Sequence, residues 1–502
     1  MSHLPILPVL IPFLAAALML LLRPSLHRAF ALAAACTALV VALLLVAQAG
    51  TGAIAVYALG NWPAPFGIVL VADRLATMMV LLVFALALPA LLLATDGTDA
   101  RGRHFHPLFQ LQLAGLAGAF LTGDLFNLFV FFEILLLASY ALLLHGGGRE
   151  RARAGMAYVV LNLVGSALFL IALGLLYGTL GTLNLADMAQ LLPLVPAGDF
   201  ALVRTAFAIL VAVFLLKAAV LPMAFWLPHT YAAATPPVGV LFALMTKVGI
   251  VALLRLHSLV FTDAPVTQGL LLPWLPVLAL LTMALGTAGV FAAQRLASLA
   301  ANLVLVSSGT LLFAVTFADA RATAALLFYL PHTTLVTAGL FLLAGMMAER
   351  RGLLGDRLVK GPCVGDRMRM GGAFAILAIA VSGLPPLSGF LGKIMLMQAA
   401  GQGAWQAAYW AALLGSGLGV TMVLARTAST LFWQPQDPLP RVQMGTGPAL
   451  ALGLLVAASP LLTLAAAPVA DWAQETATQL HARQPYIHAV LGDAPVAREA
   501  RP

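Results

Sequence analysis

Three of the four lysines in these 502 residues lie inside apolar stretches long enough to cross a membrane: Lys217 in VAVFLLKAAVLP, Lys247 in LFALMTKVGIVALL and Lys393 in SGFLGKIMLMQ. Glu133 is placed in the same way, in LFVFFEILLLASY. An ionisable side chain at mid-membrane depth costs about 3 kcal/mol or more, so each of the four is a candidate functional residue. Because a buried lysine can release and regain a proton, the set predicts a proton path through a membrane.

Two histidines extend this set. His332 lies in the middle of the apolar stretch LLFYLPHTTLVTAGLF, and the ordinary pKa of histidine suits proton shuttling. A lone buried histidine can also be a hydrogen-bonded core residue, but the threonines that follow His332 favour a hydrated setting. His229 follows the interrupted stretch around Pro222 and Pro228 and is a candidate site of proton uptake from the inside; the alternative is an ordinary interfacial histidine.

Glu133 and Lys217 are predicted to form an ion pair. A pair that opens and closes would switch the lysine between holding and releasing its proton. The alternative for Glu133 is a neutral carboxyl group that is hydrogen-bonded across helices. The alternative for Lys393, which is closer to a loop than Lys217 or Lys247, is a side chain that extends to the membrane surface.

The composition places the chain among polytopic membrane proteins. It is 62% hydrophobic and 9% charged, whereas soluble proteins are about 25% charged. A helix needs about 20 apolar residues to span a bilayer. We therefore expect an all-α protein with about fourteen transmembrane helices, near residues 4–22, 29–48, 70–94, 107–122, 125–145, 155–178, 202–227, 234–256, 269–291, 297–317, 322–347, 372–398, 404–430 and 446–468.

Two of these stretches are predicted to be broken helices. Pro222 and Pro228 interrupt the seventh, and Pro385 and Pro386 interrupt the twelfth, because proline removes a backbone donor and clashes with the preceding turn. Broken helices at matching positions of inverted repeats are typical of ion sites in transporters. The predicted organisation is therefore helices 1–3 over residues 1–106, a five-helix repeat over 107–257, its inverted copy over 269–431, and a last helix with a polar tail over 446–502.

The charges predict the orientation. When loops are assigned alternately from an outside N-terminus, 16 Lys and Arg fall inside and seven fall outside or near the outer interface. By the positive-inside rule both termini lie outside, which requires an even number of spans. The first stretch has no basic segment before it and is not a cleavable signal peptide. We expect no long lateral helix after the last span.

No cofactor or metal site is expected. The sequence contains no phosphate-binding glycine loop, no dinucleotide fingerprint, no zinc-binding HExxH and no CxxC. The two cysteines, Cys36 and Cys363, are predicted to lie far apart and so give neither a disulfide framework nor a metal site.

Four sequence blocks resemble the antiporter-like membrane subunits shared by respiratory complex I, membrane-bound hydrogenases and the Mrp/Pha multisubunit cation/proton antiporters. The blocks are TGDLFNLFVFFEILLLASYALL, LLKAAVLPMAFWLP, LMTKVGIVALLR and SGLPPLSGFLGK. The first block and the tail pattern QPYIHAVLG most resemble the D subunits of the Mrp type. The resemblance implies fourteen helices in two inverted five-helix repeats, and a central axis of proton transfer made by Glu133, Lys217, Lys247, His332 and Lys393.

Two functions follow from this resemblance. The first is a subunit that moves protons in exchange for Na⁺ or K⁺, within a hetero-oligomer of small hydrophobic subunits in a bacterial cytoplasmic membrane. The second is a proton-pumping subunit of a complex I-type NADH:quinone oxidoreductase or a membrane-bound hydrogenase, which would use the same residues without binding a redox centre. A scaffold with vestigial polar residues is the least favoured reading, because five such groups lie at bilayer depth.

Overall fold

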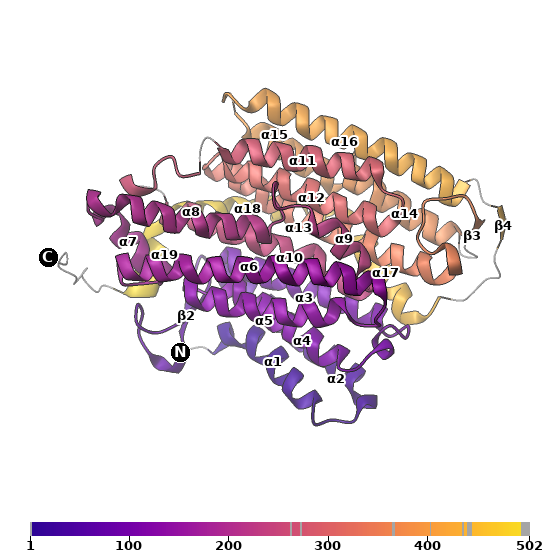
Figure 1. Cartoon of the computed structure of the whole chain (residues 1–502), viewed down its shortest axis with the longest axis horizontal. Coiled ribbons are helices and arrows are strands. Elements are labelled where there is room, and N and C mark those ends of the chain that lie inside the picture. The colour runs from indigo at the N-terminus through magenta and orange to yellow at the C-terminus, as the bar shows by residue number, and fades with distance from the viewer. Residues whose placement is uncertain are drawn as a thin grey trace.

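The computed structural model describes residues 3–261, 264–271, 274–363, 367–401, 403–433, 436–438 and 444–492. Arg441, Arg498 and Arg501, which contribute to the predicted charge distribution, lie outside these residues. The long helices run side by side along one direction, with α10 and α13 inside the bundle (Figure 1). The helices are α1 Leu7–Met19, α2 His27–Gly50, α3 Arg74–Ala94, α4 Phe105–Leu121, α5 Leu125–Leu143, α6 Arg149–Leu180, α7 Leu185–Leu191, α8 Phe200–Lys217, α9 Trp226–Ala233, α10 Pro236–Arg255, α11 Trp274–Ala292, α12 Leu296–Val315, α13 Ala320–Arg350, α14 Arg367–Ser382, α15 Ser388–Ala399, α16 Gln406–Ala428, α17 Thr446–Leu464, α18 Ala466–His481 and α19 Arg483–Leu491.

Within the described residues, eleven helical segments are long and apolar enough to cross a membrane. The chain is therefore an all-α polytopic membrane protein, as its composition predicts. The three expected spans outside these eleven coincide with α1, with the 17-residue α4 and with the pair α14 and α15. The number of crossings stays a prediction, because these helices are shorter than a full span.

The two predicted breaks are present. The seventh stretch divides into α8, which ends at Lys217, and α9, which begins at Trp226. The twelfth divides into α14, which ends at Ser382, and α15, which begins at Ser388. Each break releases the last carbonyl groups of the first half-helix from intrahelical hydrogen bonds, so they can accept from other donors.

The same packing pattern recurs in the two proposed repeats. Helix α4 packs on α5 as α11 packs on α12, and α5 meets α6 as α12 meets α13. Helix α6 contacts both halves of the first broken helix, and α13 contacts both halves of the second. Finally, α8 packs on α10 as α14 packs on α16. Each repeat therefore places its broken helix between its third and fifth helices.

Two regions differ from the sequence prediction. Residues Val69–Ala72, expected to begin the third span, form strand β2, which pairs antiparallel with β1, Ala55–Ala58. All four residues of β2 are buried, and a short buried apolar run has no periodicity that separates strand from helix. The expected polar tail also forms two helices, because α18 follows α17 directly and packs on α3 and α13 within the bundle, and α19 follows α18.

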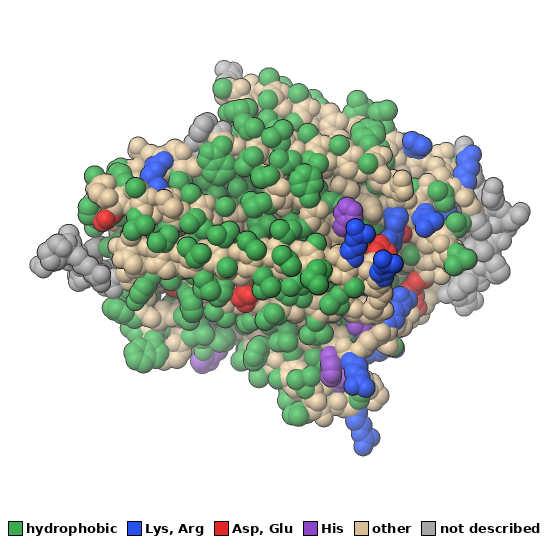
Figure 2. All heavy atoms as spheres, in the orientation of Figure 1, with side chains coloured by type: hydrophobic (Ala, Val, Ile, Leu, Met, Phe, Trp, Pro, Cys, Tyr) green, Lys and Arg blue, Asp and Glu red, His purple; other side chains and the backbone are tan. Residues whose placement is uncertain are grey.

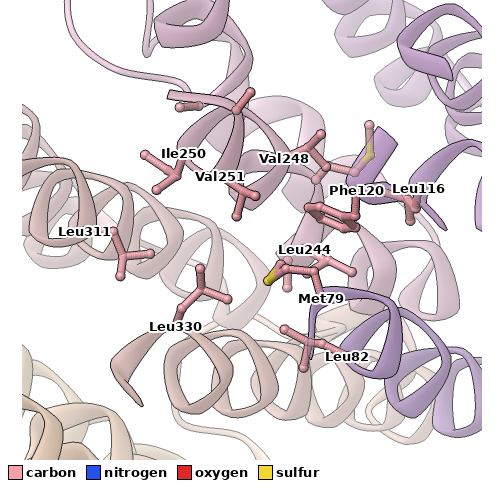
Figure 3. Close-up of a cluster of buried hydrophobic side chains, with 14 of the residues drawn as sticks. Met79, Leu82, Leu116, Phe120, Leu244, Val248, Ile250, Val251, Leu311 and Leu330 are labelled. Carbon is pink, nitrogen blue, oxygen red and sulfur yellow. The ribbon is translucent and has the colours of Figure 1, made fainter. Parts of the chain in front are cut away.

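The apolar core lies where α10 meets its neighbours. Helix α10 is buried over the whole of its most apolar window, as expected for a helix that is hydrophobic all round. Figure 3 shows Leu244, Val248 and Val251 of α10 facing side chains of α3, α4, α12 and α13. The core therefore encloses the helix that carries Lys247.

Basic side chains gather at one end of the bundle (Figure 2). There Arg101 pairs with Glu349 at 2.8 Å, and Arg295 pairs with Asp356 at 2.8 Å. Asp99 in the same region accepts hydrogen bonds from Arg28 and lies 3.0 Å from His106 Nε2. Burial opposes ionisation of Asp99, but its hydrogen bonds to Arg28 and His106 keep its pKa below the ordinary value. The Asp99 carboxylate therefore stays ionised and links Arg28 to His106 at this end of the bundle.

Gly249 tests the packing that positions Lys217. A Cβ at Gly249 on α10 would lie 2.7 Å from the Phe214 carbonyl oxygen and 2.9 Å from the Ala218 nitrogen, both backbone atoms of the α8 end. We expect Gly249→Ala to cost about 1–3 kcal/mol because the helices must separate. The measurement is the midpoint of thermal unfolding in detergent. Gly174→Ala on α6, where a Cβ meets nothing within 4 Å, is the control, and equal midpoints for the two variants would contradict the packing.

Candidate functional site

Lys217 is the last residue of α8, and its side chain is buried with 6% of the residue exposed. Its ammonium group donates to Asn162 Oδ1 on α6 at 3.0 Å. The Asn162 amide is oriented by its own Nδ2, which donates to the Tyr158 carbonyl at 2.9 Å. The oxygen of Asn162 is therefore fixed toward the lysine, and Lys217 is held by a neutral acceptor.

Glu133 on α5 has a different partner. The Ser166 hydroxyl on α6 donates to the Glu133 carboxylate. Glu133 and Lys217 are both among the described residues, and no Glu133 oxygen lies close enough to the Lys217 ammonium group, within 4.0 Å, to form an ion pair. Asn162 and Ser166 are four residues apart and so lie on the same face of α6. One face of α6 thus binds Lys217 and Glu133 at separate residues. The predicted direct ion pair between them is therefore not formed.

Lys247 lies at the centre of the bundle and is completely buried. Its ammonium group donates to Ser307 Oγ on α12 at 3.0 Å and lies 3.4 Å from Thr246 Oγ1. The second lysine is thus also held by neutral oxygen atoms. It lies on the helix that packs against the α8 end, so the first two lysines are on neighbouring elements.

Lys393 uses the second break. It lies on α15 and donates to the carbonyl oxygen of Ser382, the last residue of α14, at 2.7 Å. That carbonyl is available because the helix ends there. Gly383 follows it with φ +78°, and a Cβ at Gly383 would lie 2.6 Å from Lys393 Cδ. A glycine is therefore needed at this residue both for the turn and to leave room for the Lys393 side chain. The Lys393 ammonium group bonds to the α14 end and does not extend to the membrane surface.

His332 lies on α13 close to the second break and is 1% exposed. Its Nδ1 shares a 2.8 Å hydrogen bond with Ser388 Oγ, which in turn is 2.8 Å from Ser459 Oγ on α17. The histidine is thus hydrogen-bonded toward the first turn of α15 and α17. This chain of hydrogen bonds leads to Ser459 on α17.

His229 is exposed on α9, 12 residues after Lys217. Between α9 and Asn162 lies a group of buried aromatic side chains: Tyr158 stacks on Trp226 with ring centres 5.2 Å apart, and its hydroxyl is 2.9 Å from Ser139 Oγ. The Tyr231 hydroxyl and the Trp226 indole nitrogen in this group are buried without a hydrogen-bond partner among the described residues. Such groups normally need a partner or a water.

The three lysines share one chemical feature: each ammonium group donates to a neutral oxygen, from an amide, a hydroxyl or a carbonyl. A lysine paired with a carboxylate would leave an unpaired buried anion when it lost its proton, which is strongly unfavourable. A lysine held by a neutral oxygen leaves no charge behind. The arrangement therefore allows each lysine to change its protonation state inside the membrane.

The sequence prediction missed the residues that hold the lysines and Glu133. Asn162, Ser166 and Ser307 lie in apolar helices, where serine and asparagine usually bond to their own helix backbone. Only the tertiary contacts reveal their partners.

Within the described residues, no group of three or more His, Cys, Asp or Glu side chains is close enough to hold a metal ion. The Asp124 side chain caps α5 by accepting a hydrogen bond from the Asn127 nitrogen.

Known proteins resemble this chain over almost its entire length. The D subunit of a probable K(+)/H(+) antiporter of Rhizobium meliloti (strain 1021) is 41% identical, and the alignment covers 98% of each chain. The D subunit of an Na(+)/H(+) antiporter of Bacillus subtilis (strain 168) is 33% identical, over 98% of this chain and 100% of its own.

Solved structures show the same fold. A chain of the Mrp complex from Dietzia sp. DQ12-45-1b has a TM-score of 0.88 and 26% identity, over 98% of this chain and 100% of that one. A chain of respiratory complex I from Thermus thermophilus has a TM-score of 0.79 and 25% identity, over 95% of this chain and 99% of that one. The sequence profile of the NADH:quinone oxidoreductase/Mrp antiporter transmembrane family matches residues 122–419, which include Glu133 and the three buried lysines. With more than half of its length matched by this profile, the chain belongs to the NADH:quinone oxidoreductase/Mrp antiporter family.

Proposed function

We propose that this chain is the proton-translocating D-type membrane subunit of a multisubunit Na⁺ or K⁺/H⁺ antiporter. The observation that carries the proposal is the set of three lysines in the apolar helices, each donating to a neutral oxygen. Proton transfer needs groups that can be charged or neutral at the same place, and these contacts permit both. The relatives that align over almost the whole chain are antiporter subunits by name, which supports the same function.

Each residue has a proposed role in proton transfer. Glu133 and Lys217 form a switch in which the lysine exchanges Asn162 for the carboxylate. Lys247 passes the proton through the centre of the bundle, and Lys393 delivers it at the second break. His332 supports the second break and takes part in transfer there, and His229 is the uptake site on the inner side. The polar atoms of Tyr231 and Trp226 that lack partners among the described residues support a hydrated route from α9 toward Lys217.

The proposed setting is a hetero-oligomer with other small hydrophobic subunits in a bacterial cytoplasmic membrane. The alternative is a proton-pumping subunit of a complex I-type oxidoreductase or a membrane-bound hydrogenase. Native mass spectrometry of the complex, purified through a tag on this chain, separates the two. Several small membrane subunits support the antiporter, whereas flavin and iron–sulfur proteins among the partners would contradict it.

Lys217→Ala tests the central residue. We expect this variant to lose cation/proton antiport, because the ammonium group at the end of α8 is the proposed proton carrier there. The measurement is the collapse of a proton gradient in everted vesicles after addition of Na⁺ or K⁺. Lys360→Ala changes the one lysine outside the membrane, which is exposed, and should keep the wild-type rate. Wild-type antiport by a correctly assembled Lys217→Ala complex would refute the proposal.

Asn162→Asp tests the need for a neutral acceptor. The change is almost isosteric and keeps the oxygen beside Lys217, but it adds a carboxylate that would hold the lysine in its charged form. We expect antiport to fall close to the level of Lys217→Ala. Asn302→Asp places the same carboxylate at another buried asparagine, on α12, whose amide donates to the Ser298 carbonyl, and should retain more activity. Full activity of Asn162→Asp would contradict the proposed switch.

Reporter fusions test the proposed orientation. With both termini outside, alkaline phosphatase fused to the C-terminus should be active, and the same reporter inserted at Lys360 should be inactive. The reason is the excess of basic residues in the loops assigned to the inside. An inactive C-terminal fusion together with an active fusion at Lys360 would contradict the proposed orientation.

A further inference from the structure

One buried histidine outside the proposed proton path has a ring nitrogen without a partner. His106 lies in the first turn of α4, at the basic end of the bundle, and α4 is not among the eleven long apolar segments. Its side chain is 7% exposed, and its Nε2 is 3.0 Å from Asp99 Oδ2. Because ionised Asp99 can only accept, Nε2 carries the proton and donates. Nδ1 is buried and has no hydrogen-bond partner among the described residues, so the imidazole is held through one nitrogen.

Adding a proton at Nδ1 is unfavourable at this place. Protonated histidine has a donor on both nitrogens, and the second donor would be buried without an acceptor among the described residues. The peptide dipoles in the first turn of α4 also disfavour a cation there. Burial lowers the pKa of His106 below its ordinary value, and the Asp99 carboxylate offsets only part of this effect.

The stability of this end of the bundle therefore depends on pH. In an unfolded chain His106 would take up a proton near the ordinary pKa of histidine, about 6.5, whereas the folded chain resists protonation. The stabilisation is fully present above that pH. It is lost as the pH falls below it, toward the lower pKa of the folded state.

Positive charge from α2 lies beside the histidine. Arg28 donates to both Asp99 oxygen atoms, at 2.6 and 2.7 Å, so the carboxylate is shared between Arg28 and His106. The charge of Arg28 opposes a second positive charge at His106, and His27 adds to this repulsion when it is protonated. Asp99 is thus already neutralised by Arg28 and does not fully compensate an imidazolium ion.

The other helices that pack on α4 are α1, α3, α5 and α10. Helix α1 has no ionisable side chain. The ionisable groups of the other three are bonded to partners of their own, Arg74 to Glu475, Glu133 to Ser166, Lys247 to Ser307 and Arg255 to Asp73. Among the described residues, the groups of α2 and the Asp99 carboxylate are therefore the charges that act on His106.

One loop joins these contacts to the helices of the proton path. The loop at residues 95–104, which contains the carboxylate, connects α3 to α4. His145, just after α5, donates from Nε2 to the Thr98 carbonyl at 2.9 Å, and Arg101 donates to Glu349 at the end of α13 at 2.8 Å. The loop therefore holds the ends of α5 and α13, which both carry residues of the proposed proton path.

We propose that His106 senses the pH on the inner side of the membrane, and that its protonation loosens the loop at residues 95–104 and stops antiport. The inference rests on the proposed proton-translocating function and on the predicted inner position of the basic end. The proton comes from the inner aqueous phase and binds the lone pair of Nδ1, and no covalent bond breaks. His106 does not carry the transported protons, but controls the ends of helices that do.

His106→Gln tests the sensor. The glutamine amide can still donate to Asp99, but it does not take up a proton. Everted vesicles expose the inner side to the bath. Below the ordinary pKa of histidine, the wild-type antiport rate should fall by about tenfold per pH unit once the protonated form predominates. The variant should keep the wild-type rate at alkaline pH and lose this fall.

His104→Asn is the matched control. His104 is an exposed histidine of the same loop with φ +61°, a conformation that asparagine tolerates, and this variant should follow the wild-type pH profile. A purely structural role of His106 would lower the His106→Gln rate equally at every pH. That result, or a wild-type fall in rate at low pH in His106→Gln, would overturn the inference.

Hydrogen exchange of the complete wild-type complex supplies a readout that needs no variant. After correction for the intrinsic pH dependence of exchange, residues 95–104 should lose protection as the pH falls, while the paired strands β1 and β2 before α3 keep theirs. Unchanged protection of the loop would overturn the inference. Antiport by Lys217→Ala would instead overturn the proposed function, so the two failures are distinguishable.

Discussion

The structure depends on the cost of placing a charge inside a membrane. Each of the three lysines at bilayer depth must find a partner within reach, because no bulk water is available there. In this chain the partner is an amide, a hydroxyl or a backbone carbonyl, and in no case a carboxylate of the described residues. A neutral partner stabilises the ammonium form without making loss of the proton prohibitive. This choice of partner turns a costly buried charge into a group that can exchange a proton.

The broken helices supply what ordinary helices lack. An intact helix satisfies its own carbonyl groups, so it has none to offer to a lysine. The break after Ser382 releases a carbonyl that holds Lys393, and the break after Lys217 ends α8 where the lysine meets α6. Because packing around the two breaks follows the same pattern, one structural device serves both halves of the bundle. Helices α10 and α13, one from each half, pack on each other and join the two halves.

Much of this arrangement could be predicted from the sequence, for a physical reason. Lysine and glutamate are so unfavourable in apolar helices that their presence alone marks Lys217, Lys247, Lys393 and Glu133 as candidates. Pro222 and the pair Pro385 and Pro386 mark the breaks just as directly, whereas Pro228, which the sequence also predicts to interrupt the helix, lies in the first turn of α9, where proline is tolerated. Asn162, Ser166 and Ser307 could not be found in this way, since a serine or asparagine in an apolar helix is inexpensive and its partner depends on tertiary packing. The buried strand Val69–Ala72 could not be separated from the span that follows it, because four apolar residues carry no helical or strand period.

The most direct test of the account is to observe the protonation of the lysines themselves. The chain has only four lysines, so selective ¹⁵N labelling of their side chains gives few signals, each assignable by its loss in a single Lys→Gln variant. The reconstituted complex would be studied by solid-state magnetic resonance while the proton gradient is changed. The signals of Lys217, Lys247 and Lys393 should interconvert between ammonium and amine forms during transport, while Lys360 stays an ammonium ion. Three buried lysines that all remain ammonium ions while antiport proceeds would contradict it.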